Sequence, residues 1–188
     1  APEKRVAGAF TRAFVALRGP DAKSKLLHRL AYGVYSHRIA DARTPFDWIS
    51  SDPREVDAFI EDEGTGFVFT GMVYVALTEG AYRAAAKSAF QGIPKQLPVL
   101  LIAGDCDPVG GNGKQVEKVG DRMRRAGVES TTIKLYGGMR HEILNEAGRE
   151  EVYADVASWM DEVMREAEMG AGCPPAAPRS VRSEHEKV

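Results

Sequence analysis

The sequence predicts an α/β protein in which a helical region, residues 1–93, precedes a strand–helix–strand–helix unit over residues 94–168. Residues 98–104 form a continuous apolar run, which is typical of a strand covered on both faces. Residues 131–136 form a second β-rich segment, and the stretch between the two has helical spacing. We therefore expect two parallel strands joined by a right-handed crossover.

The helical region contains one clear helix start, at Asp52 and Pro53. Asp52 is a suitable N-cap, Pro53 fits the first turn, and Glu55 stands where it would close a capping box. Residues 72–90, rich in alanine, predict a further helix. No segment of this region has the pattern of a convincing buried strand.

The later elements follow in a regular order. Apolar residues with helical spacing predict a helix over 115–126, with Gly127 as its C-cap. The same spacing predicts a long last helix over 147–169. Residues 169–188 are rich in proline, alanine and serine and have little to bury, so we expect a disordered tail.

The composition is that of an ordinary globular protein. Of 188 residues, 44% are hydrophobic and 28% are charged, with a net charge of -2. This balance gives no reason to expect nucleic acid or an anionic membrane as a partner, and no apolar run is long enough for a transmembrane segment. Two cysteines, Cys106 and Cys173, are best explained as unpaired thiols, which indicates a cytoplasmic location.

Two polar residues follow the predicted strands and are candidates for catalysis. Asp107 comes three residues after the first strand, and His141 comes five after the second. The carboxyl ends of neighbouring parallel strands meet at one edge, where an acid could orient an imidazole for nucleophilic catalysis. Asp107 is preferred to Asp105 because Pro108 fixes the turn after it. An aspartate turn former, and a histidine that simply begins the last helix, remain open alternatives.

Other motifs in the same loops are weaker. Residues 110–114 lack the Walker spacing of a phosphate-binding loop, and residues 105–110 begin like a calcium loop that continues with valines where oxygen ligands are needed. Cys106, Asp107 and His141 lack the spacing of a zinc site. Cys106 itself is a minor candidate nucleophile. We therefore expect no metal and no cofactor.

The two loop motifs support a family resemblance. Gly104-Asp-Cys-Asp-Pro-Val-Gly110 and Gly138-Met-Arg-His-Glu142, in this order around a helix and a strand, resemble the C-terminal part of α/β-hydrolases. The most similar branch contains the monoacylglycerol lipases and lysophospholipases, the S33-type serine aminopeptidases. The resemblance covers roughly residues 22–166. Residues 43–52 and 66–70 resemble the cap that these enzymes insert over the active site.

The resemblance implies a partial α/β-hydrolase fold, with a helical cap followed by the last βαβα unit of a parallel sheet. It implies a serine hydrolase for carboxylic esters, of monoacylglycerol or lysophospholipid type, with a small ester or lipid as substrate. It selects Asp107 as the catalytic acid and His141 as the base.

The sequence departs from the family in its nucleophile. The family takes its serine from a Gly-x-Ser-x-Gly turn that precedes the cap, and no serine of this chain has those flanking glycines. We therefore expect the chain to begin inside or just before the cap, to lack the nucleophile half and to be inactive alone. The alternative is a non-catalytic α/β binding or interaction module. Two strands without their neighbours would leave an unpaired sheet edge through which copies could associate.

Overall fold

The computed structural model of the protein describes residues 2–40 and 42–170. These residues fall into two compact units divided between residues 149 and 150, and each unit is described by itself. The predicted boundary between residues 93 and 94 stays a prediction.

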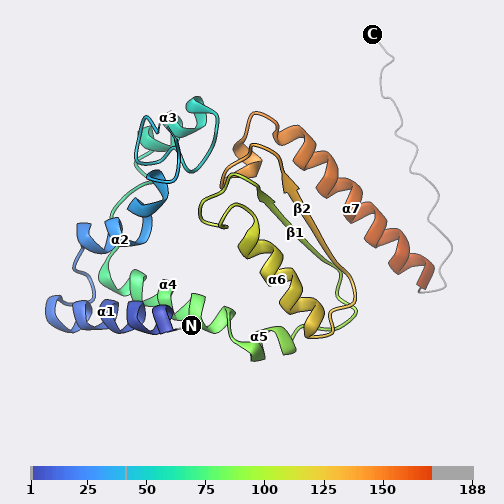
Figure 1. The fold of residues 1–188 in the computed structure, drawn as a ribbon, viewed down its shortest axis with the longest axis horizontal. Coiled ribbons are helices and arrows are strands. Elements are labelled where there is room, and N and C mark those ends of the chain that lie inside the picture. The colour runs from blue at the N-terminus through green and yellow to red at the C-terminus, as the bar shows by residue number, and fades with distance from the viewer. Residues whose placement is uncertain (1, 41, 171–188) are drawn as a thin grey trace, which may run out of the picture. The chain divides into compact units, whose positions relative to one another are not determined.

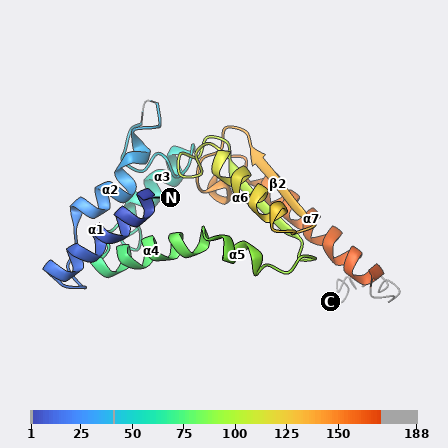
Figure 2. The ribbon, with the colours of Figure 1, turned by 60° about the horizontal axis from the view of Figure 1, so that its bottom comes forward.

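Five helices form the first part of the larger unit (Figure 1). α1 packs along α4, and Figures 1 and 2 both show the two side by side. Their close approach requires a glycine, because a Cβ atom on Gly71 would lie 2.9 Å from the Val15 side chain. The five helices are α1 (Pro2–Arg18), α2 (Lys25–Ser36), α3 (Pro53–Glu61), α4 (Gly71–Ala84) and α5 (Lys87–Gln91).

The single helix predicted over residues 72–90 is wrong, because the structure divides it between α4 and α5. Ala85 ends α4, and Ala86 takes an extended conformation with φ -69° and ψ 146°. Alanine favours helix at every one of these positions, so propensity alone does not locate the break.

Asp52 is the N-cap of α3, as predicted, and its side chain accepts a hydrogen bond from the backbone N–H of Arg54 at 2.9 Å. The predicted capping box is wrong. The backbone N–H of Asp52 donates to Ser50 Oγ at 3.0 Å, and the Glu55 carboxylate pairs with Arg149 at 2.8 Å. Ser50 is already in place beside that N–H, which leaves Glu55 available for a distant arginine.

Two parallel strands follow, β1 (Val99–Gly104) and β2 (Thr131–Tyr136), and they are the only strands among the described residues. Their register pairs the first residues, Val99 with Thr131, and the last, Gly104 with Tyr136. Both strands therefore end at the same edge. Helix α6 (Lys114–Arg125) connects them and contacts both (Figure 1). The C-cap of α6 is Ala126, and Gly127, predicted as the C-cap, follows it with φ +91°.

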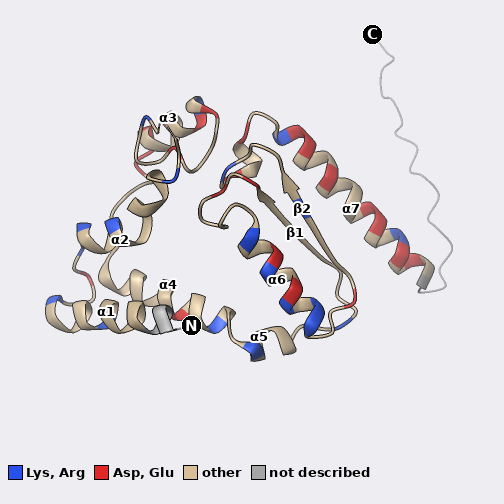
Figure 3. Cartoon of the chain, viewed as in Figure 1, with Lys and Arg blue, Asp and Glu red and all other residues tan. Residues whose placement is uncertain are grey.

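Charge is distributed unevenly over these elements (Figure 3). α6 carries residues of both signs along its length, whereas α4 has only two charged residues, Glu79 and Arg83. None of the helices within residues 2–40 and 42–170 combines the length and apolar character needed to cross a membrane.

The second unit contains all of α7 (Arg149–Gly170) except its first residue. The helix includes residues 169 and 170, which the sequence analysis places at the start of the tail. The remainder of the predicted tail, 171–188, lies outside the described residues, as does Cys173.

Candidate active site

The loops after β1 and β2 are fastened to each other by backbone hydrogen bonds. The N–H of Asp105 donates to the carbonyl of Tyr136 at 3.0 Å, and the N–H of Cys106 donates to the carbonyl of Met139, also at 3.0 Å. The parallel register places these loops at one edge of the sheet. Side chains from both loops therefore meet there.

The side chain of Asp107 is held in place by backbone N–H groups of its own loop. Its Oδ1 accepts the N–H of Val109 at 2.8 Å, and its Oδ2 accepts the N–H of Gly110 at 3.0 Å. These bonds form the turn that Pro108 favours. The side chain is only 8% exposed, so its orientation is set by the fold and not by solvent.

The carboxylate of Asp107 and the imidazole of His141 lie at hydrogen-bond distance, as their places after the two strands predict. The Nδ1 atom of His141 is 3.1 Å from Oδ2 of Asp107. Because a carboxylate only accepts, Nδ1 carries the proton and donates it, which leaves a lone pair on Nε2 of the neutral ring. No residue in the described part of the chain hydrogen-bonds to Nε2. The His141 side chain is 40% exposed, so a reactant can approach it.

Each residue changes the pKa of the other. The hydrogen bond that His141 donates to Asp107 raises the pKa of His141, with burial acting in the opposite direction and the Asp107 and Glu142 charges adding to the rise. Burial by itself would raise the pKa of Asp107. The hydrogen bonds from His141, Val109 and Gly110 outweigh it, so that pKa is lowered. Asp107 is therefore ionised near neutral pH, and it stabilises the imidazolium form of His141.

The backbone of the His141 loop is attached to residues 47–51, which the sequence assigns to the cap. The N–H of His141 donates to the Trp48 carbonyl at 3.4 Å, and the N–H of Glu142 donates to the Ile49 carbonyl at 2.8 Å. The indole ring of Trp48 packs against the imidazole, with ring centroids 5.3 Å apart. Trp48 and Ile49 are buried, so this contact belongs to the core and not to a loose surface loop.

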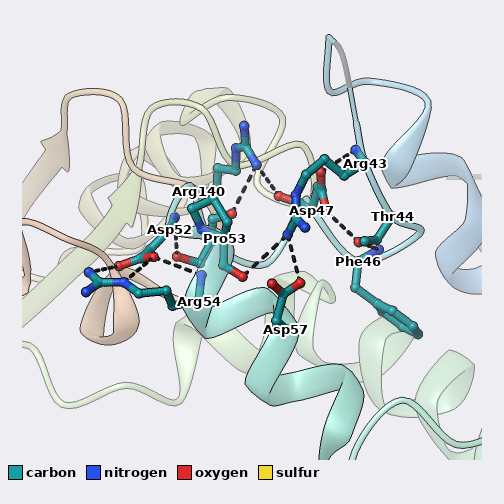
Figure 4. Close-up of polar contacts among 10 residues, drawn as sticks. Arg43, Thr44, Phe46, Asp47, Asp52, Pro53, Arg54, Asp57 and Arg140 are labelled. Atoms are coloured by element: carbon teal, nitrogen blue, oxygen red, sulfur yellow. Dashed lines mark hydrogen bonds and ion pairs between the residues drawn. The ribbon is translucent and has the colours of Figure 1, made fainter.

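Arg140, next to His141, reaches into the same segment (Figure 4). Its Nη1 donates to the backbone carbonyls of Asp47 and Ser50, the latter at 3.0 Å. The carboxylate of Asp47 folds its own turn by accepting from Thr44 and from the N–H of Arg43, the latter at 2.6 Å. Burial opposes ionisation of Asp47, but the hydrogen bonds from Thr44 and Arg43 leave its pKa lowered.

Glu146 is the most deeply buried charged residue of the loop, at 1% exposure. Its Oε1 accepts the N–H of Arg140 at 2.7 Å and the N–H of Ser51 at 2.9 Å, and its Oε2 accepts the Ser51 hydroxyl. Nearby, the Ser50 hydroxyl donates to the Asn145 carbonyl at 3.1 Å. One carboxylate thus joins both ends of the His141 loop to the segment beside it.

The other candidates have different surroundings. Asp105 is exposed, and its Oδ1 accepts the N–H of Gly138 at 2.7 Å, so it shapes the second loop and does not meet the imidazole. The hydrogen bond with Asp105 and partial burial raise the pKa of the Cys106 thiol, which disfavours the thiolate that a cysteine nucleophile needs. Within the described residues, no three side chains of the histidine, cysteine or acidic type are grouped as a metal ion would require.

Sequence reasoning missed Arg140, Glu146 and Trp48 as parts of this site. Arg140 lies next to His141 in the second motif, and Glu146 follows four residues after the end of that motif. Their partners lie about ninety residues earlier in the chain, however, and no local pattern connects the two segments. Trp48 lies in the segment 43–52 that resembles the cap, and its aromatic character alone does not indicate that it contacts His141.

With this geometry established, comparisons with known proteins identify the family. A family model described as "Serine aminopeptidase, S33" matches residues 6–148. The chain belongs to the S33 serine aminopeptidase family. It is 31% identical over 147 residues to a monoacylglycerol lipase of Mycolicibacterium smegmatis, an alignment that covers 74% of this chain and 45% of that protein.

Solved structures give the same fold for this S33 family member. A highly thermostable carboxyl esterase from Bacillus coagulans, in complex with glycerol, superposes with a TM-score of 0.78 at 26% identity, over 86% of this chain and 53% of that one. A lipase in an open form superposes with a TM-score of 0.75 at 24% identity, over 82% and 50% of the two chains. The chain therefore has a partial α/β-hydrolase fold, as predicted, and it spans about half the length of the proteins it matches.

Proposed function

We propose that Asp107 and His141 are the acid and base of a serine hydrolase that cleaves carboxylic esters. The observation that carries the proposal is the 3.1 Å contact between Asp107 Oδ2 and His141 Nδ1, which leaves Nε2 to accept a proton. Membership of the S33 family supports it, and so do a lipase relative and an esterase neighbour.

In the proposed reaction, His141 moves protons and Asp107 holds it in position. Nε2 takes the proton of a serine hydroxyl as the serine oxygen bonds to the ester carbon. The imidazolium, stabilised by Asp107, then gives that proton to the departing alcohol as the ester C–O bond breaks. Water attacks the acyl-enzyme in turn: Nε2 accepts a proton from it and returns one to the serine oxygen, and the carboxylic acid leaves.

We propose that the nucleophile is not among these 188 residues. The sequence contains no Gly-x-Ser-x-Gly, and the serines nearest the His141 loop already have structural partners. Ser50 donates to Asn145, and Ser51 donates to Glu146. Ser24 is occupied as the N-cap of α2, where it accepts the Leu27 N–H.

The proposed substrates are monoacylglycerols or lysophospholipids, with residues 1–93 acting as a cap. An apolar pocket of about 730 Å³ among α1, α2 and α4 supports an acyl chain as part of the substrate. Its lining includes Phe10, Leu27, Leu30, Tyr74 and Leu77.

A fluorophosphonate probe, which labels reactive serines, tests the proposal on the 188-residue chain and on the polypeptide of the whole reading frame. We expect no serine of the 188-residue chain to be labelled. In the polypeptide encoded by the whole reading frame around it, we expect one serine to be labelled and monoacylglycerol to be hydrolysed, and both should fall by at least about 10³-fold in His141→Gln.

The possible results separate the alternatives. Labelling of a serine within the 188 residues that depends on His141 would overturn the missing nucleophile but keep the acid–base pair. A whole reading frame without a reactive serine, which binds lipid without turnover, would replace the hydrolase with the non-catalytic binding module.

A further inference from the structure

Glu146 makes no hydrogen bond to Asp107 or His141 among the described residues, but its carboxylate joins the two ends of the loop that bears the histidine. The loop runs from Arg140 to Glu146 and returns on itself through the bond between the Arg140 N–H and Glu146 Oε1. The same carboxylate accepts two donors from Ser51. His141 therefore lies inside a closed loop whose two ends are held by one buried side chain.

This arrangement is costly unless all of its hydrogen bonds form. A carboxylate with 1% exposure has lost its water, and a buried charge without partners would destabilise the protein. Three donors within one site offset this loss and fix the direction of the side chain. The site cannot relax by rotating Glu146 outward without breaking all three bonds at once.

The contact between Glu146 and Ser51 is connected to His141 through backbone hydrogen bonds. Trp48 and Ile49 accept the N–H groups of His141 and Glu142. Ser51 holds their segment beside the loop, together with the bonds that Arg140 and Ser50 make. A shift of Ser51 away from Glu146 would move the Trp48 carbonyl, and with it the imidazole. A displacement of about 1 Å is enough to lose a well-aligned hydrogen bond such as that to Asp107.

We propose that Glu146 is a positioning residue, which holds His141 against Asp107 by fastening the histidine loop to Ser51 of the cap segment. The importance of this contact for catalysis rests on the proposed function. The contact itself does not, because the bond between His141 and Asp107 can be observed without turnover.

The test is the pKa of His141, measured by NMR on the 188-residue chain from the imidazole Hε1 signal as pH is raised. His141→Gln assigns the signal among the four histidines. Asp107→Asn shows the result of losing the carboxylate, since the pKa should fall toward the ordinary value of about 6.5 or below. We expect Glu146→Ala to lower the pKa of His141 in the same direction.

Glu146→Gln is the matched variant that separates position from charge. Its amide oxygen can accept both N–H groups, and its NH₂ can donate to a rotated Ser51 hydroxyl, so the geometry is kept while the charge is lost. We expect the pKa of His141 to stay close to that of the parent. A fall as large as in Glu146→Ala would mean that Glu146 acts through its field, and the positioning role would be overturned.

Loss of stability is controlled separately. Ser24→Ala removes the N-cap bond to Leu27 and should lower the urea midpoint of unfolding while leaving the pKa of His141 unchanged. If Glu146→Ala does not fold, Ser51→Ala takes its place in the test. It removes the hydroxyl donor, one of the three bonds to Glu146, and should lower the pKa of His141 by less than Asp107→Asn does. A parental pKa in a folded Glu146→Ala, or in Ser51→Ala, would overturn the proposal.

Discussion

Gly104, the last residue of β1, lies directly against the backbone carbonyl of Met139 in the loop that carries His141. A Cβ atom at position 104 would stand well under 3.0 Å from the carbonyl oxygens of both Met139 and Arg140. The same carbonyl of Met139 accepts the N–H of Cys106, two residues after the glycine. The loop that carries Asp107 and the loop that carries His141 are thus fitted to each other through backbone atoms, at a place where a side chain has no room.

Gly104→Ala should therefore be strongly destabilising. The added methyl group meets backbone on two sides, so relief requires the loops to separate, and we expect a loss of about 2–3 kcal/mol or more in the free energy of unfolding. Urea unfolding followed by circular dichroism measures it. Gly80→Ala is the control: that glycine is inside α4 with open space around it, and the change should raise stability by up to about 1 kcal/mol. Equal effects at the two positions would contradict the close fit.

The bond between His141 and Asp107 should appear in the pH dependence of stability. The pKa of His141 is higher in the folded protein than in the unfolded chain, so the charged imidazole stabilises the folded state. This stabilisation is complete below the unfolded pKa of about 6.5 and is lost as pH rises through the higher folded pKa. The pKa of Asp107 is lower in the folded protein than in the unfolded chain, so its carboxylate also stabilises the folded state. This stabilisation is present above the unfolded pKa of about 3.9 and is lost as pH falls through the lower folded pKa.

Unfolding of the parent and of His141→Gln at a series of pH values measures this contribution. The difference in free energy between the two should shrink as pH rises above about 6.5. In Asp107→Asn, the free energy of unfolding should show neither the loss at high pH that comes from His141 nor the loss at low pH that comes from Asp107. A difference between parent and His141→Gln that grows as pH rises would show that the imidazole is not stabilised in its charged form.

The sequence predicts that Asp107 and His141 lie close together, because strand ends and parallel order determine where they lie. The run 98–104 and the segment 131–136 are long enough to be recognised, and a parallel pair brings Asp107 and His141 to one edge whatever the loops do in detail. The parts that were missed depend on long-range contacts. Residues 47–51 have no regular secondary structure, so periodicity gives no indication that they accept hydrogen bonds from the His141 loop.

The error at Glu55 has the same physical origin. A capping box is a local pattern, and here a nearer hydroxyl, Ser50, takes the N–H of Asp52. The carboxylate that the pattern assigned to the helix start instead pairs with Arg149. Local rules identify where α3 begins, but the partner of each polar group depends on residues that only the folded chain brings near.

Arg140→Met should loosen the same segment by removing its hydrogen bonds to the carbonyls of Asp47 and Ser50. Both residues are buried, so their carbonyls would lose a charged donor without gaining water, and we expect a loss of about 2 kcal/mol in the free energy of unfolding. Arg140→Lys should recover only part of it, since an ammonium group lacks the planar geometry of guanidinium. Arg83→Met is the control for removing an arginine: its side chain is 81% exposed and pairs with Glu79 at 3.7 Å, so the change should stay within about 0.5 kcal/mol. Parental stability in Arg140→Met would show that the two carbonyls do not need the guanidinium.

Trp48 is the last part of the site whose role can be measured separately. Its ring fills the space between His141 and the tyrosines of α2, with centroids 5.3 Å from His141 and 5.4 Å from Tyr35. Trp48→Ala should cost about 3–5 kcal/mol, because a 7% exposed indole leaves a large cavity. Trp48→Phe should cost less than half of that: a ring still packs on the imidazole, and the change removes an indole N–H that has no hydrogen-bond partner among the described residues. Urea unfolding of both variants gives the comparison, and a phenylalanine variant as unstable as the alanine one would mean that the indole N–H has a partner, such as water, that the packing argument omits.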